Sequence, residues 1–284
     1  MKRNNEQPGN IITSELIKRL GPFRFQKQSN IPTASTFKEL TKSQQDNSPK
    51  SAPPGTEEST KWVEIKYSDG SHYKGQIGRE TEKREGQGTF CFADGSRYDG
   101  FWHQNKAEGR GRLIMADGSF YEGNFVNGKF EGFGTFTNFN GAKYKGLWKN
   151  GLQSGKGSEE WEDGTTFEGE FIEGKKVGRG IFKWADGCVY AGLMQENKLH
   201  GEGLYKWPDG REYRGMWQQN YMNGKGMFVW PDGRRFRGQY KKDKKNGYGV
   251  FEHTNGNKYV GNWQDGLQHG AGVFITADGS QHEG

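Results

Sequence analysis

A repeat of about 23 residues runs through most of the chain, and a period of this length limits the fold more than any other feature. Each repeat begins with an aromatic residue that stands two positions before a glycine. The first interval, from Tyr73 to Tyr98, is slightly longer than the later intervals, which are all equal. Such a period predicts an array of small units, each of which buries its apolar face against its neighbours. The aromatic residues are Tyr73, Tyr98, Tyr121, Tyr144, Phe167, Tyr190, Tyr213, Phe236 and Tyr259, and His282 holds the same position near the end.

Two further features keep the same period and indicate what each unit is. A Gly-x-Gly pair and an Asp-Gly or Asn-Gly dipeptide recur in phase, as at Gly178-x-Gly180 and Asp186-Gly187. Aromatic residues and glycines alternate, as in Tyr144-x-Gly146-x-Trp148, which places them on one face of a β-strand. Asp-Gly and Asn-Gly dipeptides are typical of tight turns between strands. We therefore expect an all-β fold: an elongated single antiparallel meander sheet of about nine β-hairpins, one in each repeat.

The composition indicates how such a sheet holds together. Glycine accounts for 46 of 284 residues and hydrophobic residues for 30%, so a thick aliphatic core is excluded. The chain nevertheless has 19 Phe, 12 Tyr and 9 Trp, more than a disordered chain would carry. Because glycine leaves space for a large ring on the neighbouring strand, we expect aromatic rings to pack over glycines.

Residues 1–60 differ from the rest. They hold six of the eight prolines and neither Trp nor Tyr, so this segment is expected to be a largely disordered or extended tail before an array at 61–284. Within the tail, four apolar residues predict a short helix at 11–20. This segment is either a transient helix or a peptide that folds when it docks on a partner. The four residues are Ile12, Leu16, Ile17 and Leu20.

The sequence contains no motif that is typical of an enzyme's active site. The Gly-Lys pairs are followed by glycine rather than by Ser or Thr, so they form no phosphate-binding loop, and the six histidines show no metal-ligand spacing. We therefore expect no catalytic residues, cofactor or metal. The net charge of +6 forms no dense basic stripe, which argues against nucleic-acid binding. Cys91 and Cys188 give no support for a disulfide, and the chain is expected to be reduced and intracellular.

The repeat itself resembles the MORN (membrane occupation and recognition nexus) repeat. Tyr213–Trp217 (YRGMW) and Gly224–Phe228 (GKGMF) fit its pattern closely, and the resemblance runs from Trp62 to Gly284. It implies a non-enzymatic scaffold or adaptor that binds protein partners within a large intracellular assembly. Such arrays occur in axonemal radial spoke heads, so the resemblance favours a cytoplasmic place in a ciliary axoneme or in the cytoskeleton.

Two rows of side chains are candidate partner surfaces in the C-terminal half. The first row either packs at strand ends or lines an aromatic groove for a partner helix or a second array. It consists of Trp161, Trp184, Trp207 and Trp230. The second row lies on the face opposite the glycines and is either ordinary strand packing or an exposed interface. It consists of Ile181, Leu204, Met227, Val250 and Val273.

A cluster of lysines supports an alternative function. The resemblance also implies membrane or phosphoinositide binding, which would need a basic surface. The best candidate is the segment with Lys241, Lys242, Lys244 and Lys245, which is otherwise a solvated loop. We rank this membrane-binding module below the protein scaffold.

Overall fold

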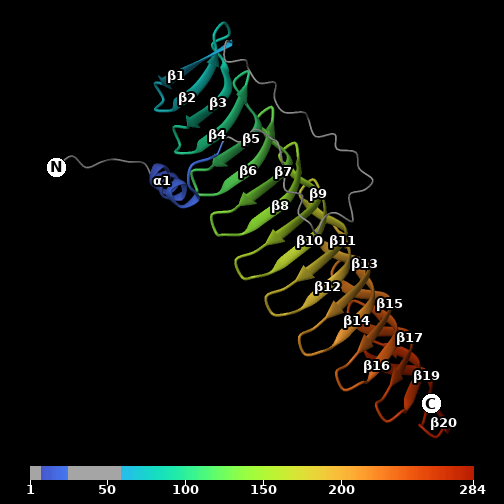
Figure 1. The fold of residues 1–284 in the computed structure, drawn as a ribbon. Coiled ribbons are helices and arrows are strands. Elements are labelled where there is room, and N and C mark those ends of the chain that lie inside the picture. Colours follow the sequence, from blue (N-terminus) through green and yellow to red (C-terminus); the bar gives the residue numbers. More distant parts are fainter. Residues whose placement is uncertain (1–7, 25–58) are drawn as a thin grey trace. The chain divides into compact units, whose positions relative to one another are not determined.

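The computed structural model describes residues 8–24 and 59–284. Within these ranges, twenty strands form an antiparallel meander in which strands that are consecutive in the chain pair within each unit (Figure 1). The two compact units are Met1–Leu152 and Gln153–Gly284, which we call unit 1 and unit 2. The predicted all-β meander of hairpin repeats is confirmed. The predicted disorder of the tail falls mostly on residues outside the described ranges.

The described part of unit 1 contains one helix and the first eight strands. The helix is α1 (Pro8–Leu20), which includes the segment expected to be helical, and it ends where Gly21 donates its N–H to the carbonyl oxygen of Ile17, at 2.8 Å. The strands are β1 (Thr60–Lys66), β2 (His72–Gly78), β3 (Arg84–Cys91), β4 (Arg97–His103), β5 (Lys106–Ile114), β6 (Phe120–Val126), β7 (Lys129–Thr137) and β8 (Lys143–Lys149).

Unit 2 continues the same alternation of shorter and longer strands. Its strands are β9 (Leu152–Glu160), β10 (Thr166–Ile172), β11 (Lys175–Lys183), β12 (Val189–Gln195), β13 (Lys198–Lys206), β14 (Glu212–Gln218), β15 (Tyr221–Val229), β16 (Arg235–Lys241), β17 (Lys244–Glu252), β18 (Lys258–Gln264), β19 (Leu267–Ile275) and β20 (Gln281–Glu283). The short last strand, which carries His282, pairs with β19.

Glycines of neighbouring strands face one another, and aromatic rings cover many of these pairs. Gly215 is the register partner of Gly226, and the buried Tyr213 covers both. A Cβ atom added at Gly226 would lie 2.4 Å from the Tyr213 hydroxyl oxygen. That hydroxyl donates a hydrogen bond to the carbonyl oxygen of Met216, at 3.0 Å, which fixes the ring in place. The expected packing of rings over glycines is therefore present, and we call this side of the sheet the glycine face.

The Asp-Gly dipeptides form the turns that the sequence predicts. Gly187 has a φ of 87°, which favours glycine, and Asp186 accepts the N–H of Cys188 at 2.9 Å. Asn140 accepts the N–H of Ala142 in the equivalent turn of an earlier repeat, at 3.1 Å. Local hydrogen bonds thus stabilise the turns that reverse the chain, and the strands between the turns pair with their neighbours in a regular register.

Candidate binding groove

The predicted tryptophan row lies on the glycine face of unit 2 and belongs to a longer series of rings. Trp184 stacks on Phe182 with ring centroids 4.5 Å apart, and it contacts Tyr205 at 5.3 Å. Tyr205 in turn contacts Trp207 at 4.5 Å. We call the whole series the aromatic ladder. It consists of Trp161, Phe182, Trp184, Tyr205, Trp207, Phe228, Trp230 and Phe251, and its four tryptophans are all half-buried.

A second row on the same face was not identified from the sequence. It stands two positions before each Gly-x-Gly pair, and in unit 2 it pairs across strands with the position of Trp217: Leu199 faces Met194, and Met222 faces Trp217. Its residue type changes from repeat to repeat, a signal that a column-by-column reading of the repeats would have found. We call it the floor position. It is held by Arg84, Ala107, Phe130, Gln153, Lys176, Leu199, Met222, Lys245 and Gln268.

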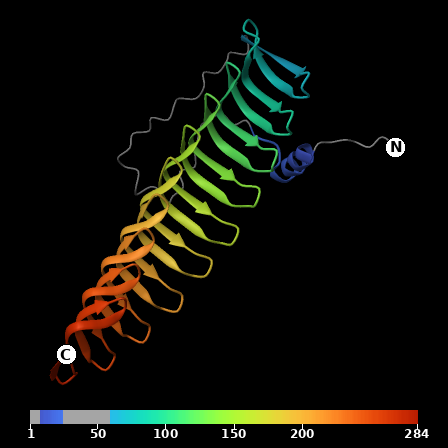
Figure 2. The ribbon, with the colours of Figure 1, turned by 180° about the vertical axis from the view of Figure 1, so that it is seen from behind.

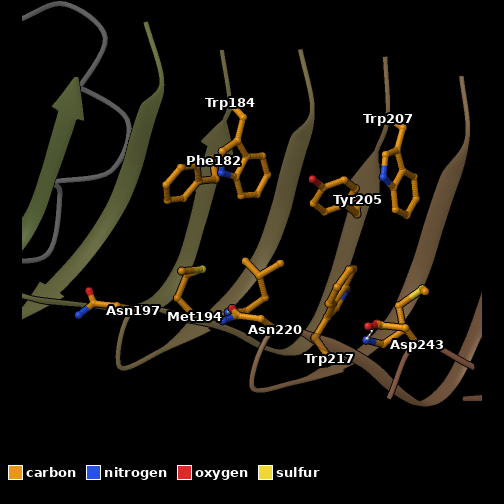
Figure 3. Close-up of a pocket in the computed structure, with 11 residues that line it drawn as sticks. Phe182, Trp184, Met194, Asn197, Tyr205, Trp207, Trp217, Asn220 and Asp243 are labelled. Carbon is orange, nitrogen blue, oxygen red and sulfur yellow. Dashed lines mark hydrogen bonds between the residues drawn. The ribbon is translucent and has the colours of Figure 1, made fainter. Parts of the chain in front are cut away.

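A groove of about 580 Å³ opens on the glycine face where the floor residues are Leu199 and Met222. Figure 3 shows Trp184 and Trp207 along one side, and Met194 and Trp217 along the other. The floor side chains here are aliphatic, so the rings on both sides border open space. The complete lining is Phe182, Trp184, Met194, Asn197, Leu199, Tyr205, Trp207, Trp217, Asn220, Met222 and Asp243.

The polar residues of the groove hold the hairpin ends together. Asn220 accepts the backbone N–H of Leu199 at 2.8 Å, and Asp243 accepts that of Met222 at 2.7 Å. Both residues adopt a positive φ, 73° and 68°, which Asn and Asp tolerate better than most residues. Their side chains therefore keep successive turns in register. Trp217 is 6% exposed, and its indole Nε1 has no hydrogen-bond acceptor within the described residues.

A lysine stands at the floor position on each side of the groove. Lys176 pairs with the carboxylate of Glu159 at 2.5 Å and lies over the Trp161 ring at 5.0 Å. Lys245 lies among four rings, the nearest being Trp263 at 4.2 Å. Burial lowers the pKa of the Lys245 ammonium, and the charge of Arg234 lowers it further. The apolar middle of the groove thus lies between two floor lysines, of which Lys176 is paired with a carboxylate of this chain.

The second predicted row lies on the face opposite the glycines, but it forms no continuous apolar strip. Ile181 is 44% exposed and Met227 is 36% exposed, while Leu204, Val250 and Val273 are half-buried. The register places exposed Arg214 between Leu204 and Met227, and exposed Arg237 between Met227 and Val250. Charged side chains therefore interrupt the row, and the groove is the better candidate surface.

The structure does not bring the four lysines of the alternative function together. Lys241 pairs in register with Lys244, and Lys242 lies in the turn between them. Lys244 is 3.8 Å from Asp265. Lys245 lies on the glycine face among the rings, so its ammonium is separated from the other three. The sequence alternation of a strand already implied this split between Lys244 and Lys245.

The tail residues that the structure describes contact the opposite face of unit 1 through Arg112. Figure 2 draws α1 and the strands of unit 1 from behind. Arg112, which is 8% exposed, donates a hydrogen bond to the carbonyl oxygen of Gly21 at 2.9 Å and lies over the Phe23 ring at 5.6 Å. Its guanidinium also pairs with Glu122 at 2.9 Å. Of the predicted docking residues, Leu16, Ile17 and Leu20 are half-buried, and the side chain of Ile12 is not described.

Within residues 8–24 and 59–284, no group of His, Cys, Asp and Glu side chains could hold a metal ion. Cys91 and Cys188 are both free thiols. No helix in the described part of the chain has the length and apolar character needed to cross a membrane.

Comparisons with known proteins agree with the repeat pattern. The MORN repeat family model matches residues 83–97, 98–120, 121–143, 144–166, 167–189, 190–210, 213–234, 236–258 and 259–281. No curated protein matches the chain.

Solved structures match the chain only at low similarity. A mutant of the TCP10 domain of Danio rerio CPAP is 10% identical with a TM-score of 0.37, and the match covers 78% of this chain and 96% of that one. The SAS-4 (dCPAP) TCP domain of Drosophila melanogaster, solved with a proline-rich motif of Ana2 (dSTIL), is 14% identical with a TM-score of 0.34, covering 66% and 95%. At these TM-scores neither structure bears on the groove.

Proposed function

Because the chain belongs to the MORN repeat family, we propose that it is a non-enzymatic scaffold that holds a segment of a partner protein in the groove of unit 2. The observation that carries this proposal is the groove itself, where half-buried tryptophans border open space above Leu199 and Met222. Trp is enriched among residues that anchor protein interfaces, because its ring supplies a large contact area with few rotatable bonds. A partner side chain placed there would complete the aromatic packing.

A phenylalanine at the floor position of unit 1 shows how an aromatic side chain can fill the space that is open in unit 2. Phe130 holds the floor position in unit 1 and stacks on Tyr121 with ring centroids 3.8 Å apart. In unit 2 the same spacing along the chain separates Met222 from Tyr213. We therefore expect Met222→Phe to stack on Tyr213 and fill the groove without disturbing the fold.

This variant tests the proposed function. Short random peptides displayed on phage would be selected on the immobilised full-length chain and then tested on Met222→Phe and on Met227→Phe. Met227 is exposed on the opposite face, so the second variant is a matched control. We expect selected peptides to lose binding to Met222→Phe and to keep binding to Met227→Phe. Peptides that bind both variants equally, or a selection without enrichment, would contradict the proposal.

We further propose that the scaffold works in the cytoplasm, within a multi-subunit assembly of the ciliary axoneme or cytoskeleton. The support is the resemblance to the MORN repeat alone, because arrays of this repeat occur in axonemal radial spoke heads. A tagged copy expressed in ciliated cells is expected to stay with the axonemes after detergent extraction. Its release with the soluble fraction, or its pelleting with anionic vesicles in a salt-sensitive way, would favour another site.

A further inference from the structure

We propose that the groove selects an extended partner segment with an apolar side chain at one position and a carboxylate three positions away, and that Lys245 binds this carboxylate. This inference rests on the proposed function of the groove. It adds the chemical class of the partner: an acidic, apolar peptide segment.

The floor position holds two lysines in unit 2, and only one of them has a carboxylate partner within the described residues. Lys176 pairs with Glu159 at 2.5 Å, and both side chains are largely buried. Glu159 belongs to β9, two strands before β11 with Lys176, and Phe228 in β15 holds the equivalent position two strands before Lys245 in β17. The chain thus shows that a floor lysine binds a carboxylate, and at Lys245 it supplies a phenyl ring instead.

The charge of Lys245 is not compensated by any described carboxylate. None of the described carboxylates lies within ion-pair distance of its ammonium, whereas Lys244 beside it is 3.8 Å from Asp265. The rings of Phe236, Phe251 and Trp263 attract the cation by their π faces, but they do not neutralise it. A half-buried cation without a counter-charge favours an anionic partner, because the carboxylate would replace the water that burial removes.

The distance between Met222 and Lys245 along the sheet sets the spacing of the partner's two side chains. Met222 and Lys245 hold the same position in consecutive repeats, two strands apart, so they are separated by about 9.6 Å along the sheet. A polyproline II segment brings residues i and i+3 to one side every ~9.3 Å. Two turns of an α-helix span about 10.8 Å, which exceeds the repeat spacing of about 9.6 Å, so successive helix turns would not stay aligned with successive floor residues. The spacing therefore favours an extended segment over the helix that the sequence suggested.

The test uses two short fluorescein-labelled peptides of equal length. One carries a Leu-Pro-Pro-Glu core between Gly-Ser flanks, and the other has Gln in place of Glu. Fluorescence anisotropy would measure their binding to the full-length chain and to Lys245→Gln, Lys244→Gln and Met222→Phe. Gln already holds the floor position at Gln268, so Lys245→Gln is expected to fold, and circular dichroism would check each variant.

We expect the wild-type chain to bind the Glu peptide roughly fivefold to tenfold more tightly than the Gln peptide. This preference should disappear in Lys245→Gln and persist in Lys244→Gln. Equal binding of the two peptides that is still lost in Met222→Phe would overturn this inference and leave the proposed function intact. Absence of binding, or binding that Met222→Phe does not weaken, would contradict both. A Glu preference that survives in Lys245→Gln would overturn the inference by placing the carboxylate elsewhere.

Discussion

Unit 1 and unit 2 share one backbone pattern but differ at the floor position. In unit 1, Phe130 stacks on Tyr121, and Arg84 lies over the ring of Trp102 at 4.3 Å. In unit 2, Leu199 and Met222 hold this position and a groove opens beside them. The indole groups follow the same division: Nε1 of Trp148 donates to the carbonyl oxygen of Gly134 at 3.2 Å, whereas Nε1 of Trp217 has no acceptor within the described residues. The residue type at the floor position can therefore decide whether the glycine face is packed or open for binding.

The largest expected effect concerns what the two units have in common. A Cβ atom at Gly111 would lie 2.4 Å from the Tyr98 hydroxyl, and one at Gly226 would lie 2.4 Å from the Tyr213 hydroxyl. We expect Gly111→Val and Gly226→Val each to lower the free energy of unfolding by about 3 kcal/mol through overpacking. Urea denaturation would measure this, with Ala191→Val on the exposed face as the control. Losses that differ widely between the two sites would show that the ring packing is not equivalent.

The next effect concerns the face of unit 1 that lies opposite the glycine face. In unit 1 that face carries Arg112, which holds the tail segment through Gly21 and pairs with Glu122. We expect Arg112→Met to leave Glu122 without its partner and to cost about 2 kcal/mol, less than a fully buried pair because Glu122 is partly exposed. Hydrogen exchange should also become faster in α1 and in residues 21–24. Unchanged exchange there would mean that Arg112 does not hold the tail.

A smaller effect should follow from exchanging the floor residues. We expect Phe130→Met to lose about 1 kcal/mol of stability, because the stacking on Tyr121 is removed. Met222→Phe should gain a similar amount by stacking on Tyr213. Thermal unfolding of the two variants and of the double variant would measure both changes. If Met222→Phe instead loses stability, the groove cannot accept a ring and the comparison between the units fails.

The smallest effect is a dependence on pH that arises in the turns. Asp209 and Asp232 accept backbone N–H groups of Arg211 and Arg234, and these hydrogen bonds lower the pKa of both carboxyl groups below the ordinary value of 3.8. A pKa that is lower in the folded state means that the contribution to stability is present above pH 3.8 and is lost as the pH falls through the folded value.

Acid titration of the unfolding free energy would test this. We expect Asp209→Asn/Asp232→Asn to flatten the decline below pH 3.8, because Asn255 accepts the N–H of Asn257 in an equivalent turn without a charge. An unchanged acid profile would mean that these turns do not contribute to it.

The sequence predicted the repeat, the hairpins, the turns and the packing of rings over glycines, because each follows from local periodicity. It also placed Trp184 and Trp207 in one row. It missed Leu199 and Met222, since the role of a floor residue depends on which rings its cross-strand neighbours supply. No periodic signal marks the contact between Arg112 and the tail. The four lysines were grouped by sequence proximity, although alternation along a strand separates Lys245 from the others.

Photo-crosslinking tests the central claim, that partners bind in the groove of unit 2, most directly. A peptide selected on the full-length chain would carry a benzophenone side chain, which reacts readily with methionine. Met194 and Met222 line the groove, while Met227 is exposed on the opposite face. Mass spectrometry should find the peptide attached to Met194 or Met222, and attachment at Met227 alone would contradict the claim.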